Sequence, residues 1–165
     1  MRETIGRLLH APATDRPHAI ALITEAVWWV TMVDATLVRY HPDTYDSVLA
    51  ADPARPVIES TFSGLRFVRN QMGYHVDPAD FIRPADRRAI GPNGSAPLAA
   101  WTWRPVAEPG VDALPARGQE WEMIRYRDYE SRLARRSIGE TFQCASDFLR
   151  LVWQASMPPA ASGAS

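Results

Sequence analysis

Apolar and polar residues alternate with helical spacing along most of the chain. Between about Pro17 and Tyr40, apolar side chains recur every three or four positions, and Thr14 or Asp15 precedes them as a candidate N-cap. Asp34 falls on the same apolar stripe. Because an unpaired buried carboxylate is strongly unfavourable, Asp34 needs a partner from another part of the fold. The pattern therefore predicts a long, buried helix with one acidic residue in its packed face.

Two more helices are expected before the middle of the chain. The pair His41-Pro42 ends the first helix, and Asp43 is the predicted cap of a short helix that stops at Asp52-Pro53. A third helix is predicted to begin near Pro56. Its buried stripe comprises Ile58, Phe62, Leu65, Val68 and Met72.

The composition changes from about Val76 to Gly118. This stretch contains half of the 14 prolines of the chain, which excludes a long helix. Within it, the sequence LAAWTWRPV alternates with the period of a strand and places Trp101 and Trp103 on one side. We interpret residues 77–118 as an insertion that holds a short β-hairpin.

Helical spacing returns from about Gln119 to Gln154. The sequence SIGE, from Ser137 to Glu140, resembles a capping box, so a break is expected near Gly139. The core stripe of this last element comprises Ile138, Phe142, Ala145, Leu149 and Val152. Together the elements predict an all-α fold, a bundle of four to five helices with a Pro/Gly-rich insertion. We expect one domain over residues 1–155 and a flexible tail over residues 156–165.

Composition and charge narrow the classes of function. An apolar fraction of 46 % suits a globular protein, and a net charge of −1 gives no overall attraction to nucleic acid or membrane. All 18 basic residues are arginine, whose planar guanidinium suits phosphate or carboxylate. Cys144 is the single cysteine and lies in an apolar helical pattern, so we expect it in the core of a cytoplasmic protein.

Neither the N-terminal residues nor the most apolar run of the chain has the pattern expected of a membrane protein. The N-terminal residues lack the pattern of a signal peptide. The most apolar run of the chain is interrupted by Glu25 and Asp34, which favours a buried helix over a membrane span. We therefore expect a soluble protein without membrane contact.

The sequence RNQMGYH, from Arg69 to His75, ends the third predicted helix. On one continuous helix the two terminal residues of this stretch would point about 120° apart. They converge only if the helix stops between them, and Gly73 is the predicted stop because glycine readily adopts the left-handed conformation. A helix end at this point would bring an arginine and a histidine to one site.

These residue types suit the cleavage of RNA. A histidine exchanges protons near neutral pH, so His75 can take a proton from a ribose 2′-hydroxyl or give one to a leaving oxygen. Arg69 can hold phosphate oxygens, and Asn70 can orient either group. This chemistry requires no metal or cofactor, and no histidine of the chain has the spacing of a zinc site.

At this point the chain resembles a known family. An arginine, four to six intervening residues that begin with a polar one, and a histidine form the signature of the HEPN superfamily of ribonucleases, and RNQMGYH has five. The resemblance implies a helical bundle, metal-independent RNA cleavage, and a homodimer whose motifs line a shared cleft. It assigns catalytic roles to Arg69, Asn70 and His75. Some members carry a tyrosine two positions after the histidine, where this chain has Asp77.

Other residues surround this motif. Arg66, one turn before Arg69, and Tyr74, directly before the histidine, are candidate substrate-binding residues. Arg66 has an alternative partner in Glu59, and we expect that surface pair to form. Asp34 is a candidate ion-pair partner that would position Arg69 and satisfy its own buried charge.

The last helical element carries five arginines among acidic and aromatic residues. We interpret them as a solvated face with internal ion pairs, and a track for the RNA backbone is the alternative. The arginines are Arg125, Arg127, Arg132, Arg135 and Arg136.

Three functions from different classes remain open. The leading hypothesis is a HEPN-type endoribonuclease that acts as a toxin or in phage defence, with an antitoxin or another regulatory partner. The second is a non-catalytic helical module that binds a nucleotide or a partner. The third is a small-molecule-binding bundle whose apolar pocket is lined by Trp28, Trp29, Trp101 and Trp103.

Overall fold

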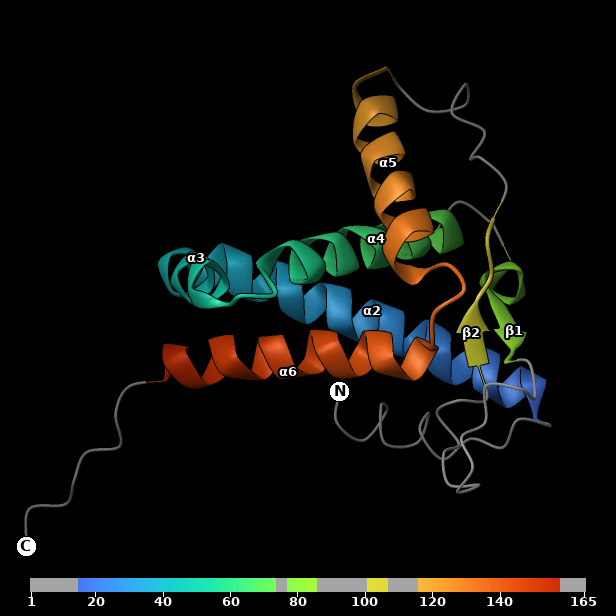
Figure 1. The fold of residues 1–165 in the computed structure, drawn as a ribbon, viewed down its shortest axis with the longest axis horizontal. Helices are drawn as coiled ribbons and strands as arrows, with labels where there is room; N and C mark the ends of the chain where they lie inside the picture. The colour runs from blue at the N-terminus through green and yellow to red at the C-terminus, as the bar shows by residue number, and fades with distance from the viewer. Residues whose placement is uncertain (1–14, 74–76, 86–100, 107–115, 158–165) are drawn as a thin grey trace, which may run out of the picture.

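The computed structural model describes residues 15–73, 77–85, 101–106 and 116–157. Within these ranges the chain forms five α-helices, a short 3-10 helix, a five-residue π-helix and one pair of strands (Figure 1). The predicted all-α bundle with a small hairpin is therefore confirmed. Helices α2 (Arg16–Tyr40), α4 (Arg55–Gly73) and α6 (Ile138–Ser156) lie alongside one another, α3 (Pro42–Ala51) covers one end, and the hairpin lies at the other end (Figure 1).

Helix α2 spans Arg16–Tyr40. Of the two candidate caps, Asp15 is the N-cap, and its side chain accepts a hydrogen bond from the backbone N–H of His18 at 3.1 Å. Pro17 occupies the first turn, where the missing backbone N–H is not needed. One face of the helix is buried against α4 and α6 and includes Asp34, as the apolar stripe predicted.

Helix α3 spans Pro42–Ala51 and begins two residues earlier than a cap at Asp43 would allow. The prediction that Asp43 caps it was wrong: His41 is the N-cap and makes no side-chain capping bond. Proline is favoured at the first helical position because its fixed φ already matches a helix, so Pro42 starts the helix. Asp43 lies in the first turn, where its negative charge interacts favourably with the positive end of the helix dipole.

Helix α4 spans Arg55–Gly73 and supplies the centre of the core. Ile58, Phe62, Leu65 and Val68 are buried as predicted, whereas Met72 is partly buried at the edge. Phe67 is also buried, although it lies one position off the expected stripe. Its ring centroid is 6.1 Å from that of Phe81, so this side of α4 is covered by the hairpin region.

The insertion contributes a small, buried structure. The 3-10 helix η1 spans Pro78–Phe81, and strand β1 (Ile82–Pro84) pairs antiparallel with strand β2 (Trp101–Trp103). Trp101 and Trp103 are both buried, which confirms that they share the covered side of the strand. Residues 86–100 and 107–115 of the predicted insertion lie outside the described residues.

The last predicted element is two helices with a break between them. Helix α5 (Ala116–Asp128) continues into the π-helix η5 (Tyr129–Leu133), and α6 spans Ile138–Ser156. The N-cap half of the predicted capping box is confirmed, since the Ser137 side chain accepts a hydrogen bond from the backbone N–H of Glu140 at 3.3 Å. The predicted stripe of α6 is buried in full.

Tertiary hydrogen bonds explain why the break falls before Ser137. The backbone of Trp103 accepts from Arg135 N–H at 2.8 Å and donates to the Arg136 carbonyl at 3.0 Å. Arg135 has a φ of 69°, a left-handed conformation that arginine rarely adopts. The backbone at Arg135 and Arg136 therefore leaves the helical conformation and pairs with strand β2. Helix α5, which precedes this break, projects away from the other helices (Figure 1).

Helix α4 and η5 approach each other closely at Gly64. A Cβ atom placed there would lie 3.0 Å from Leu133 Cδ1 and 3.2 Å from the Tyr129 Cα. Only glycine leaves room for this contact between two backbones. The crossing fixes the base of α5 on α4, and through it the position of the α5 side chains.

One helix of the described chain, α2, is long and apolar enough to cross a membrane, with a mean hydropathy of 1.4 over its best window. Its apolar stripe is packed against α4 and α6. Helix α6 continues to Ser156, and residues 158–165 of the predicted tail lie outside the described residues.

Candidate functional site

The last turns of α4 place Arg69 between α2 and α5. Its Nη2 donates a hydrogen bond to Asn70 Oδ1 at 3.2 Å, and its guanidinium carbon lies 6.0 Å from the centroid of the Trp28 ring on α2. Trp28 is 44 % exposed, so one side of the ring meets the arginine while part of it remains open to solvent. The arginine is thus held by an amide on one side and an aromatic ring on the other.

Glu122 of α5 holds the other side of this turn. Its carboxylate accepts from Asn70 Nδ2 at 3.2 Å and from Gln71 Nε2 at 3.0 Å. Arg125, one turn further along α5, approaches the same carboxylate at 3.5 Å. Glu122 is only 3 % exposed, and these three donors compensate for the burial of its charge. Asn70 therefore links Arg69 to α5 through Glu122.

Asp34 is fully buried, with an exposed fraction of 0 %. It forms an ion pair with Arg66 of α4 and accepts a hydrogen bond from the Tyr45 hydroxyl at 2.7 Å. The expected pair between Arg66 and Glu59 was wrong, because Glu59 pairs with Arg55 at 3.0 Å. The candidate ion pair of Asp34 with Arg69 does not form either. Arg66 lies nearer to the packed face and takes that position.

Arg69 lies among charges of both signs. Burial is the main reason that the pKa of Arg69 lies below its ordinary value, the like charges of Arg125 and Arg66 lower it further, and the carboxylates of Asp34 and Glu122 offset part of this effect. Arg66 and Arg125 each have a carboxylate, whereas no carboxylate of the described residues lies within ion-pair distance of Arg69. A bound anion would therefore relieve both the desolvation and the repulsion.

The second half of the predicted motif cannot be located in the same way, since Tyr74 and His75 lie outside the described residues. Helix α4 is described up to Gly73 and the residues that follow lie outside the described ranges, so the helix end predicted at Gly73 stays a prediction. Its predicted left-handed conformation was wrong, because the φ of Gly73 lies outside that range, and a Cβ there would meet no atom within 4 Å. After the gap, η1 brings Phe81 back onto Phe67 of α4.

The four tryptophans of the pocket hypothesis are not gathered at one place. Trp28 and Trp29 are exposed on α2, whereas Trp101 and Trp103 are buried beneath the hairpin. The described residues therefore give a tryptophan-lined pocket no support. No group of three or more metal-binding side chains lies together in the described part of the chain.

The five arginines of the last predicted element divide into paired and unpaired members. Arg125 approaches Glu122, and Arg135 approaches Glu130 at 3.8 Å. Arg127 is exposed. Tyr129, which lies among these arginines in the sequence, is buried and is not available for stacking on a base. Internal ion pairs thus account for part of this face, in agreement with the favoured interpretation.

Glu122 and Trp28 are among the residues of this site that sequence reasoning did not assign to it. Glu122 precedes Arg125 by three positions, which is the spacing of an ordinary surface ion pair on a helix. Its burial depends on α5 crossing α4, far away in sequence, so no local pattern reveals it. Trp28 stands on the polar side of α2, and this was the one available signal.

The chain was also compared with known proteins. No protein-family model, curated protein sequence or solved structure matches it.

Proposed function

We propose that the protein is a metal-independent endoribonuclease of the HEPN type. The observation that carries the proposal is the Arg69 guanidinium, which has no carboxylate within ion-pair distance among the described residues and lies near the positive charges of Arg66 and Arg125. Phosphate is the anion that RNA would supply there, and arginine binds it with paired hydrogen bonds. The resemblance of RNQMGYH to the HEPN signature supplies the rest of the proposal.

In the proposed reaction, Arg69 binds the scissile phosphate and stabilises the charge that grows on its oxygens. The ribose 2′-oxygen attacks phosphorus, the bond from phosphorus to the 5′-oxygen breaks, and a cyclic phosphate and a 5′-hydroxyl result. His75 takes the proton of the attacking 2′-hydroxyl or gives a proton to the leaving 5′-oxygen. Asn70 positions Arg69, since it bonds Arg69 with its oxygen and Glu122 with its nitrogen.

Trp28 adds an argument for a nucleotide as the ligand. An exposed aromatic ring beside an arginine offers a stacking surface for a base next to a binding site for phosphate. Arg66 has the lesser role in this scheme, because its guanidinium is already engaged by Asp34. Tyr74 remains a proposed substrate contact on the strength of its position before His75.

We further propose that two copies of the chain assemble through the solvent face of α2. Trp29 and Met32 expose large apolar surfaces on this face, next to the Trp28 ring that contacts Arg69. Covering such a patch with a second copy would remove it from water and bring two motifs near a shared cleft. A cytoplasmic toxin or phage-defence effector held in check by an antitoxin or other partner is the proposed setting.

The test is RNA cleavage by the full chain in the presence of EDTA. Arg69→Ala and His75→Ala are expected to lower cleavage by at least about a hundredfold while the circular dichroism spectrum is unchanged. Arg55→Ala and His18→Ala are the matched controls, because both side chains are exposed and neither belongs to the predicted motif. Expression of the wild type and of the two control variants should be more toxic to the host cell than expression of Arg69→Ala or His75→Ala.

Three outcomes would count against the proposal. Equal cleavage by the wild type and both site variants would assign the activity to a contaminant. Binding of RNA that depends on Arg69 without any cleavage would favour the non-catalytic module instead. Cleavage that EDTA abolishes would contradict the metal-independent reaction.

A further inference from the structure

A second concave site lies on another side of α4. The cavity has a volume of about 260 Å³ and opens between α4 and the start of α6. Its lining comprises Val57, Thr61, Arg132, Arg136, Ser137, Glu140, Thr141 and Cys144. None of the residues proposed for RNA cleavage lines this cavity.

The cavity is separate from the arginine cluster at the end of α4. Val57 and Arg66 are nine positions apart on one helix, and nine steps of 100° place them on opposite sides. Val57 lines the cavity, whereas Arg66 pairs with Asp34 of α2. A ligand in the cavity would therefore meet none of the residues proposed for RNA cleavage.

Two arginines give the cavity a positive rim. Arg132 Nε donates a hydrogen bond to Ser60 Oγ at 3.2 Å. This bond holds the side chain in place and does not use the two terminal nitrogens of the guanidinium. The backbone of Arg136 is fixed by bonds to Leu133 and Trp103. Neither arginine has a carboxylate within ion-pair distance in the described part of the chain, whereas their neighbour Arg135 does.

The remaining groups define what else a ligand must carry. Thr61 and Thr141 donate their hydroxyl protons to the carbonyls of Val57 and Ser137, so the floor offers a ligand mainly methyl groups and the Cys144 side chain. Glu140 adds a carboxylate, which accepts hydrogen bonds and repels a second anionic group. The fitting ligand has one strongly anionic group, hydroxyl donors and a compact body.

We propose that this cavity binds a phosphorylated sugar, either free or as a nucleoside monophosphate. The two guanidiniums hold the phosphate, and Glu140 accepts hydrogen bonds from the sugar hydroxyls. The sugar ring lies against the Val57 and threonine methyl groups. A phosphate without a sugar would leave Glu140 unused, and a sugar without phosphate would leave both arginines unpaired.

Cys144 makes the proposal measurable, because it is the one cysteine of the chain and lines the cavity. Burial is the main reason that the pKa of its thiol is raised, and the nearby charge of Asp147 acts in the same direction. Alkylation by iodoacetamide is therefore slow but specific to this site. A bound ligand would cover the thiol and slow the reaction further.

The experiment measures the alkylation rate of the full chain with AMP, ribose 5-phosphate, adenosine or inorganic phosphate present at millimolar concentration. AMP and ribose 5-phosphate are expected to slow alkylation at least fivefold, whereas adenosine should not. Equal protection by inorganic phosphate would overturn the sugar part of the proposal, and no protection by any probe would overturn all of it. Stronger protection by a short RNA than by AMP would assign the surface to the RNA backbone instead.

Variants identify the residues responsible. Arg132→Ala and Arg136→Ala should each abolish protection, while Arg127→Ala, an exposed arginine of α5 that does not line the cavity, should retain it. Thermal unfolding of each variant separates loss of binding from loss of fold. Arg69→Ala should leave protection unchanged, so this proposal and the ribonuclease proposal can fail independently. Equal loss with Arg127→Ala would contradict the assignment.

Discussion

The Asp34 carboxylate of α2 and the Arg66 guanidinium of α4 form an ion pair in the interior of the bundle, and the Tyr45 hydroxyl of α3 completes it with a hydrogen bond of 2.7 Å. Three helices thus meet at one carboxylate. Because Arg66 lies one turn before Arg69, this contact also fixes the helix that carries the proposed phosphate-binding residue.

Removing the charge of Asp34 should destabilise the fold. Asp34→Asn leaves Arg66 without its partner, and we expect the free energy of unfolding in urea to fall by roughly 3 kcal/mol. A double-mutant cycle with Arg66→Gln should give a coupling energy of at least about 1 kcal/mol. Additive effects of the two substitutions would show that the pair contributes nothing beyond its separate side chains.

Alkaline pH should destabilise the protein through Tyr45. Burial, and then the neighbouring Asp34 charge, raise the pKa of Tyr45 above its ordinary value, and burial does the same for Tyr129. Their contribution to stability is present below the unfolded pKa of about 10 and is lost as pH rises above it, because only the unfolded state can then ionise them readily.

Unfolding measurements between about pH 8 and 11 test this expectation. Tyr45→Phe should flatten the decline above pH 10, since phenylalanine does not ionise. Absorbance of tyrosinate should show that two of the five tyrosines ionise only with unfolding. An unchanged slope in Tyr45→Phe would refute the assignment.

Two glycines of α4 should respond in opposite ways to alanine. Gly64→Ala forces a Cβ against η5 at 3.0 Å from Leu133 and 3.2 Å from the Tyr129 backbone, so we expect a loss of about 1–3 kcal/mol. Gly73→Ala meets no neighbour and should be neutral or stabilise the helix by up to about 1 kcal/mol. Chemical unfolding of both variants measures the difference, and similar effects would contradict the close approach at Gly64.

Glu122 should be sensitive to a substitution that preserves its shape. Glu122→Gln replaces one of two acceptor oxygens with a donor that faces Asn70, Gln71 or Arg125, and we expect a loss of roughly 1–2 kcal/mol. Glu59→Gln, at an exposed ion pair, should change stability by less than about 0.5 kcal/mol. Equal effects in urea unfolding would mean that the burial of Glu122 has no energetic consequence.

The proposed dimer makes a prediction about Trp29, which is 51 % exposed on α2. Trp29→Arg should shift the mass measured by light scattering from two chains to one, because a charge would enter the apolar contact. Trp153→Arg, at an exposed tryptophan of α6, is the matched control and should leave the mass unchanged. A monomeric wild type would remove the shared cleft from the proposed function.

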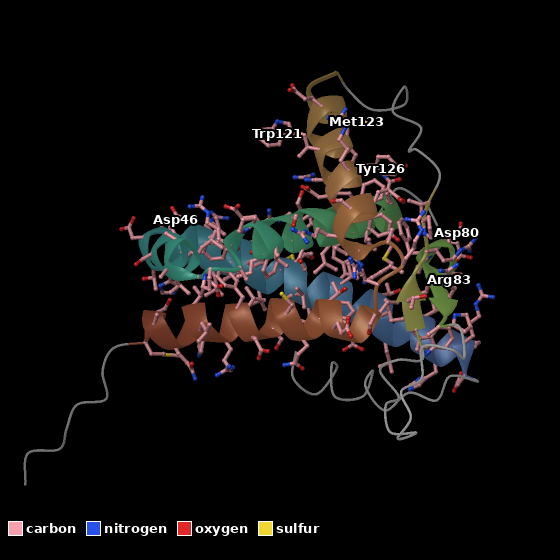
Figure 2. The ribbon with its side chains drawn as sticks, in the orientation of Figure 1. Asp46, Asp80, Arg83, Trp121, Met123 and Tyr126 are labelled. Carbon is pink, nitrogen blue, oxygen red and sulfur yellow. The ribbon has the colours of Figure 1, made fainter. Side chains whose placement is uncertain are left out.

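Other exposed apolar residues lie outside this α2 face. Trp121 is 64 % exposed and projects from α5 on the side away from Tyr126, whose ring packs on Phe67 at 5.6 Å (Figure 2). Exposure of one ring therefore does not identify an interface, and the paired variants at Trp29 and Trp153 are needed to separate the two surfaces.

Most helices and most of their buried faces could be predicted from local pattern, because helical periodicity and capping act over a few neighbouring residues. The stripes of α4 and α6, the cap at Ser137 and the paired burial of Trp101 and Trp103 all follow from such local patterns. A need for a partner at Asp34 was also readable, since burying a lone carboxylate is unfavourable.

The contacts between distant residues followed from the packing of the helices and could not be predicted from local pattern. Arg66 rather than Arg69 pairs with Asp34, because the packing of α4 on α2 turns that side chain inward. Glu122 is a buried acceptor because α5 crosses α4. The break after which the chain continues as α6 is set by the backbone bonds of Trp103 with Arg135 and Arg136. Ion pairs and helix crossings join residues far apart in sequence, and their geometry depends on the whole packed core rather than on any local pattern.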